Sequence, residues 1–128
     1  MTAGRRYEGF VPGRHVIDSY GAGGFRFADM SHRGSILALP SGVHAWSATT
    51  PADLTLDAFV QVLAEAEEID TLLVGTGKEI AFLDDAVRAR LKEGRMAVDV
   101  MSTGAAARIY NIMASENRRA AAALLAVD

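Results

Sequence analysis

Two short glycine-containing turns carry the residues best suited to bind a ligand. Gly75-Thr76-Gly77 follows a compact apolar run, and Ser102-Thr103-Gly104 ends an alternating run and starts a stretch with helical spacing. A turn between a strand and a helix exposes backbone N–H groups, which can bind an anion. The chemistry that these turns predict is recognition by backbone amides and hydroxyl groups.

The first turn is similar to a nucleotide-binding loop but lacks the residues that define one. A P-loop needs glycine five residues before its Gly-Lys pair and Ser or Thr after it, and Leu72 and Glu79 occupy these places. A dinucleotide-binding turn needs a third glycine where Ile80 stands. The sequence therefore predicts no cofactor.

Catalytic and metal-binding groups are not predicted either. The chain has no cysteine, which excludes thiol nucleophiles, thiolate zinc sites and disulfides. Ser102 lacks the flanking glycines of a nucleophile elbow. His15, His32 and His44 are too far apart in the sequence to indicate a metal site, and Asp84-Asp85 is typical of a helix start.

An anion site is the sharper hypothesis for the second turn. Ser102 or Thr103 would cap the following helix and leave the amides of Gly104, Ala105 and Ala106 facing outward. Arg108 would lie near the helix start, where the dipole disfavours a cation, so it needs a compensating partner. That partner is either a bound anion or an internal carboxylate, for which the candidates are Asp99 and Glu79.

The elements that position these turns differ between the two halves of the chain. Residues 7–48 contain short alternating runs separated by turn residues, which predict an antiparallel meander. The expected strands are His15–Tyr20, Phe25–Ala28, Ser35–Leu39 and Val43–Trp46, with turns at Gly21–Gly24, Ser31–Gly34 and Pro40–Gly42.

From Asp53 onward, helices and strands are expected to alternate. The expected elements are a helix carrying Leu56, Phe59, Val60 and Leu63, a strand at Thr71–Val74, a helix from Asp84-Asp85 to a left-handed Gly94, a strand at Met96–Met101 and a helix at Thr103–Ser115. A strand, a crossover helix and a second strand should form a right-handed parallel βαβ unit. Both glycine turns would then lie at one carboxyl edge of the sheet, where ligands bind in open α/β folds.

Composition limits the class of protein. A chain of 128 residues fits one domain, and we expect a flexible segment at residues 1–6 and a single α/β domain at 7–128. The net charge of −3, with dispersed basic residues, argues against nucleic-acid binding. No run is long enough to span a bilayer and no signal peptide is visible, so a cytoplasmic protein is expected. Ala120–Val127 is ambiguous, because alanine favours a helix while continuous burial allows a strand.

The chain resembles the family that includes mitochondrial complex I assembly factor 3 and its bacterial and archaeal relatives. The similarity lies in Gly21–Phe27, Gly34–Leu37, Leu72–Gly77 and above all Met101–Asn111, and the match covers nearly all of residues 7–127. It implies an α/β fold with a central mixed sheet, a β-rich N-terminal layer and packed helices. It also implies that Ala120–Val127 is an antiparallel strand.

The resemblance also bears on the candidate site. Many relatives have cysteine where this chain has Ala107 and threonine where it has Ile109, so thiol chemistry at the turn is excluded here. The remaining pattern is kept, which makes Arg108, Tyr110 and Asn111 candidate ligand-binding residues together with the two glycine turns.

Three hypotheses of function follow. The first is a non-enzymatic binding or assembly module with a protein partner and a role related to respiratory complex I, as the resemblance implies. The second is an enzyme or sensor that binds a small anionic metabolite at the two turns. The third is a homodimer in which the turns only pack; exposure of Trp46 or Phe25 would favour a protein contact.

Overall fold

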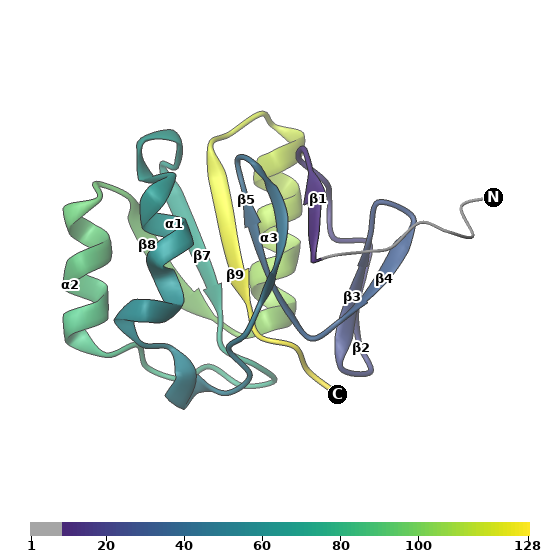
Figure 1. The fold of residues 1–128 in the computed structure, drawn as a ribbon, viewed down its shortest axis with the longest axis horizontal. Coiled ribbons are helices and arrows are strands. Elements are labelled where there is room, and N and C mark those ends of the chain that lie inside the picture. The colour runs from purple at the N-terminus through teal and green to yellow at the C-terminus, as the bar shows by residue number, and fades with distance from the viewer. Residues whose placement is uncertain (1–8) are drawn as a thin grey trace.

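The central element of the computed structural model, which describes residues 9–128, is a mixed six-stranded β-sheet (Figure 1). Within that range its strand order is β1 (Phe10–Pro12), β6 (Gly42–Trp46), β5 (Ser35–Leu39), β9 (Ala120–Leu124), β7 (Thr71–Gly75) and β8 (Ala97–Met101). Strand β9 pairs parallel with β7 and antiparallel with β5, so it joins the two halves of the chain. The single-domain α/β fold with a mixed sheet is confirmed.

Both faces of the central strands β5, β9 and β7 are buried, and their side chains alternate between the two faces. Leu37, Leu72 and Ala121 belong to one hydrophobic cluster, whereas Ile36, Leu73 and Ala122 belong to the other. Central strands covered on both faces are apolar at every position rather than at alternate ones. That explains why Thr71–Gly75 and Ala120–Leu124 read as continuous apolar runs.

Different elements cover the two faces. One face packs against the 3₁₀ turns Leu56–Phe59 and Ala66–Glu68, α1 (Val60–Ala64) and α2 (Asp85–Glu93). An exposed 3₁₀ turn, Pro51–Asp53, precedes these elements. The other packs against α3 (Thr103–Ser115) and a three-stranded antiparallel sheet of β2 (Ser19–Gly21), β3 (Gly24–Phe27) and β4 (Met30–Arg33). Figure 1 shows α1 and α2 on one side of the strands and β2–β4 on the other.

The C-terminal half follows the sequence prediction closely. Strands β7 and β8 pair in parallel, and α2 connects them along the chain. Asp84 caps α2, and α3 has the predicted bounds Thr103–Ser115. A strand is present, as the resemblance implies, but it covers Ala120–Leu124 rather than Ala120–Val127 and is antiparallel to β5 only, since it runs parallel to β7. Its pairing on both sides and the burial of both its faces outweigh the intrinsic helix preference of alanine.

Several local predictions are wrong. Ser31–Gly34 is mostly strand β4 rather than a turn, and the strand predicted at His15–Tyr20 begins only at Ser19. The predicted strands also omit β1. The helix expected after Asp53 is divided into 3₁₀ turns and the five-residue α1. These segments are too short for side-chain periodicity to set their boundaries.

The expected left-handed stop at Gly94 is also wrong. Gly94 has a φ of −77°, and the positive φ falls on Arg95, at 68°. A Cβ added at Gly94 would lie 3.2 Å from both the Ala66 Cβ and the Met96 Cε. Close packing therefore explains this glycine better than backbone conformation does. The prediction of a flexible segment at residues 1–6 lies outside the described residues.

Candidate functional site

The two glycine turns lie side by side at the carboxyl edge of β7 and β8. Thr103 N donates to the Gly77 carbonyl (2.8 Å), and Gly77 N donates to Thr103 Oγ1 (3.0 Å). Thr76 N donates to the Met101 carbonyl at 2.9 Å, which continues the parallel pairing by one residue. The adjacency expected from a parallel βαβ unit is therefore present.

The two threonine hydroxyls hold this edge together from inside. Both side chains are buried, and Thr103 Oγ1 donates to the Leu125 carbonyl at 2.7 Å while it accepts from Gly77 N. The Thr76 hydroxyl accepts from Ala81 N at 2.8 Å and lies within 3.2 Å of the Glu79 and Met101 carbonyls. The hydroxyls of Thr76 and Thr103 therefore position the backbone, and neither residue lines the pocket beside the turns.

A pocket of about 280 Å³ opens beside these turns. Ser102 caps α3 there, with its hydroxyl accepting from Ala105 N at 3.4 Å. Five of the predicted residues line it together with four that the sequence does not indicate, namely Tyr20, Lys78, Val127 and Asp128. The full lining is Tyr20, Gly77, Lys78, Ser102, Gly104, Ala105, Arg108, Val127 and Asp128. Lys78 could have been found from its place in the first turn, but Tyr20 is far from both turns in the sequence.

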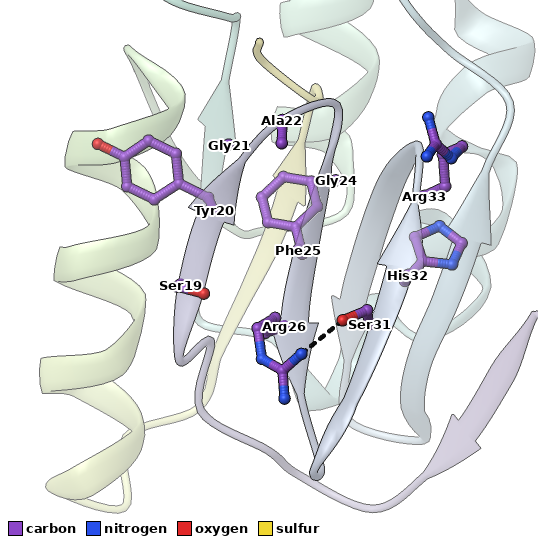
Figure 2. Close-up of a pocket in the computed structure, with 10 residues that line it drawn as sticks. All are labelled: Ser19, Tyr20, Gly21, Ala22, Gly24, Phe25, Arg26, Ser31, His32 and Arg33. Carbon is purple, nitrogen blue, oxygen red and sulfur yellow. Dashed lines mark hydrogen bonds between the residues drawn. The ribbon is translucent and has the colours of Figure 1, made fainter.

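Tyr20 lies against the first turn of α3. A Cβ added at Gly104 would overlap the Tyr20 hydroxyl, so glycine is needed there for the ring to approach the helix. Figure 2 shows the Tyr20 side chain projecting from β2 toward α3. About half of the residue remains exposed, at 49 %, so it forms a wall of the pocket.

Arg108 supplies one of two cationic side chains in this pocket, together with Lys78. Arg108 forms no ion pair with Asp99 or Glu79, so the alternative of an internal pair is wrong. The ion pairs found among residues 9–128 join other side chains. Arg108 is exposed, which places its guanidinium in water rather than in a buried pair. Asp128 lines the same pocket and offsets part of the positive charge.

Tyr110 and Asn111 have a different role from the pocket residues. Tyr110 is buried in the core, and this burial raises the pKa of its hydroxyl against the opposing effect of Arg14. The Asn111 amide clamps the backbone of Ile17, because Oδ1 accepts from Ile17 N and Nδ2 donates to Ile17 O, both at 2.8 Å. Both residues fasten the N-terminal layer to α3, and neither lines the pocket.

A larger hollow of about 520 Å³ lies over β2, β3 and β4 (Figure 2). Ser19, Arg26 and Ser31 are cross-strand neighbours and exposed, and Arg26 Nη1 donates to Ser31 Oγ at 2.6 Å. Tyr20 and Phe25 also line the hollow, although Phe25 is only 2 % exposed and belongs to the core cluster with Phe27. The exposed polar side chains of the hollow therefore lie beside aromatic ones on a small sheet.

Three further features of residues 9–128 bear on function. Trp46 and Phe25 are buried, so neither provides the exposed aromatic surface that would favour a protein contact. No cluster of three metal-ligating side chains occurs among the described residues. None of the helices in that range is both long and apolar enough to cross a membrane.

Comparison with known proteins identifies the family. A model of a protein family of unknown function (DUF498/DUF598) matches residues 17–125. An uncharacterized protein of Rhodobacter capsulatus is 38% identical over 94% of this chain and 90% of its own length. NADH dehydrogenase [ubiquinone] 1 alpha subcomplex assembly factor 3 of Danio rerio is 31% identical over 86% of this chain, which spans 63% of that protein.

A solved structure agrees with this assignment. The crystal structure of a Bartonella henselae protein, described as an outer membrane protein, superposes with a TM-score of 0.88 at 50% identity and covers 91% of this chain and 98% of its own. The match to the family model extends from the residue clamped by Asn111 to the residue that follows β9. The chain therefore belongs to the DUF498/DUF598 family of proteins of unknown function.

Proposed function

We propose that this chain is a non-enzymatic binding module whose role is related to the assembly of respiratory complex I. The similarity to assembly factor 3 of Danio rerio, over 86% of this chain, is the observation that carries the proposal. The buried threonines support binding over catalysis, because their hydroxyls are engaged with backbone groups of the fold. A protein whose polar groups are used in this way can present a rigid surface to a partner.

Crosslinked affinity purification from the native cell tests this proposal. The tagged chain should recover complex I subunits or membrane-arm intermediates after crosslinking, and an unrelated tagged protein of similar size and charge serves as the control. Recovery of no complex I component above that control contradicts the proposal. Capture of other proteins alone does not support it.

The second candidate function is binding of a small anionic metabolite at the pocket beside the glycine turns. It is favoured by Lys78 and Arg108, which line the pocket together with the start of the 13-residue helix α3. Cationic side chains and helix amides together suit a carboxylate or phosphate group. The site is proposed to lie in the cytoplasm, as the composition suggests.

Calorimetric titration with inorganic phosphate and citrate tests the second candidate. Replacement Arg108→Ala should weaken binding by roughly tenfold, the usual effect of losing a charge-assisted hydrogen bond. Arg118→Ala is the matched control, since Arg118 is exposed and does not line this pocket. Equal affinity of wild type and Arg108→Ala rules the site out.

A further inference from the structure

An apolar groove crosses the face of the molecule that carries α1 and α2. It consists of two adjoining hollows of about 480 and 430 Å³, which share Leu56. The buried side chains of Leu54, Leu83 and Val87 form the floor of the first hollow, and more exposed side chains form the walls. The apolar groove comprises Leu54, Leu56, Val60, Leu63, Phe82, Leu83, Ala86 and Val87. The groove therefore continues the hydrophobic core out to the surface.

Phe82 is the most exposed large side chain of this groove. It is 99 % exposed, and Val60 and Leu56 are 58 % and 46 % exposed. Contiguous exposed apolar residues of this kind mark interaction surfaces in soluble proteins. An aromatic side chain that contributes nothing to its own core is the type of residue that anchors a protein contact.

The exposure of Phe82 is built into the loop that carries it. Ala81 N donates to the buried Thr76 hydroxyl at 2.8 Å, and Leu83 is buried in the core cluster. Asp84 then caps α2 by accepting from Ala86 N. The residues on both sides of Phe82 are therefore anchored by hydrogen bonds or burial, so a partner would not have to order this segment on binding.

Carboxylates surround the groove. Asp57 and Asp84 line it, Asp53 and Asp85 flank lining residues, and all four are exposed. Hydrogen bonds from the Thr49 and Thr50 backbone and hydroxyls hold the pKa of Asp53 at about 2, so it is ionised at neutral pH. Arg90, the basic residue of the lining, already pairs with Glu93 at 3.3 Å. Arg88 likewise flanks a lining residue, Val87, so four carboxylates outnumber two basic side chains and the groove presents an apolar floor with a net negative rim.

We infer that the apolar groove is the docking site for an amphipathic helical segment of a partner protein, with apolar anchors on one face and basic side chains flanking them. This inference rests on the proposed function as a protein-binding module and names its partner class. A groove between helical elements suits such a segment, whose anchors recur at i, i+3, i+4 and i+7. A second copy of this chain fits less well, because a symmetric contact centred on Phe82 would bring Asp84, which lines the same hollow, toward its own copy.

The test uses defined peptides as probes. A synthetic helix of about 18 residues, roughly five turns, carries leucines on one face and lysines on the other. A second peptide replaces lysine with glutamate, and a third has the first composition in scrambled order. Binding to the full chain is measured by fluorescence anisotropy, and the contact surface is mapped by backbone amide shifts.

The lysine peptide should bind and shift amides in residues 51–64 and 80–90, with affinity roughly tenfold or more above both other peptides. Phe82→Ser should lower that affinity by roughly tenfold, and Asp57→Asn by about threefold at low salt. Ile112→Ser is the matched control and should change nothing, because Ile112 is a half-exposed apolar residue on α3. Each variant needs an unchanged amide spectrum away from its substitution.

Several outcomes overturn the inference. Equal binding of the glutamate peptide, equal binding by Phe82→Ser, or shifts confined to the other face of the sheet would each do so. Sedimentation that reveals self-association of wild type but not of Phe82→Ser would identify a second copy as the occupant and equally overturn it. Crosslinked purification with Phe82→Ser separates the two proposals: recovery of complex I components that is unchanged by the variant keeps the proposed function and rejects the groove.

Discussion

Gly77 and Thr103 hold each other through two hydrogen bonds that join the two glycine turns. Thr103 N donates to Gly77 O at 2.8 Å, and Gly77 N donates to Thr103 Oγ1 at 3.0 Å. The same hydroxyl donates to Leu125 O, just after β9. One buried side chain therefore connects the ends of three neighbouring strands, and this makes the carboxyl edge rigid.

Replacement of Thr103 by valine should destabilise the fold. Valine keeps the shape but leaves Gly77 N and Leu125 O without their partner, at a cost of about 1–3 kcal/mol in the free energy of unfolding. Thr103→Ser keeps the hydroxyl and loses one methyl group, about 0.8 kcal/mol. Urea unfolding measures both variants, and a valine variant as stable as wild type contradicts this role.

Two glycines of the same edge should respond differently to alanine. A Cβ at Gly75 would lie 2.8 Å from the Thr103 Cα, a backbone atom that cannot move aside, so Gly75→Ala should cost about 1–3 kcal/mol. Gly104→Ala displaces only the end of the half-exposed Tyr20 side chain, and its stability should stay within about 0.5 kcal/mol of wild type. Equal thermal destabilisation of both variants would disprove this distinction.

Asn111→Ala should loosen the N-terminal layer from α3. It leaves both backbone polar groups of Ile17 without their hydrogen bonds, which costs about 1–3 kcal/mol. Hydrogen exchange should quicken in β2 and β3 before it does in β7. Ser115→Ala, on the same helix but exposed, is the control and should be nearly neutral. Uniform exchange in all strands would argue against a local clamp.

Stability should depend on pH through Asp53. Hydrogen bonds from Thr49 and Thr50 lower its pKa to about 2 in the folded chain, below the ordinary value of 3.8. The unfolded chain therefore binds the proton more readily, so this contribution is complete above pH 3.8 and is lost as the pH falls toward 2. Asp53→Asn should be less stable than wild type at pH 6, and the difference should shrink below pH 3.8. A difference that is independent of pH contradicts the assignment.

The sequence by itself determined the elements with strong local signals. Asp84 is predicted to begin one helix, and Ser102 or Thr103 to cap the next; in the structure Asp84 and Ser102 cap the first-turn amides. The run from Thr71 to Val74 predicted a buried strand because its residues are apolar on both faces. The parallel pairing of β7 and β8 then placed both glycine turns at one edge.

Only the tertiary structure decided what depends on contacts between distant residues. Tyr20 approaches Gly104, and Asn111 bonds Ile17, although more than eighty residues separate each pair. Ala120–Leu124 is a strand because β5 and β7 pair with it on both sides and both of its faces are covered. The exposure of Phe82 likewise follows from the buried anchors on either side of it, since hydrophobicity along the chain reports burial only on average.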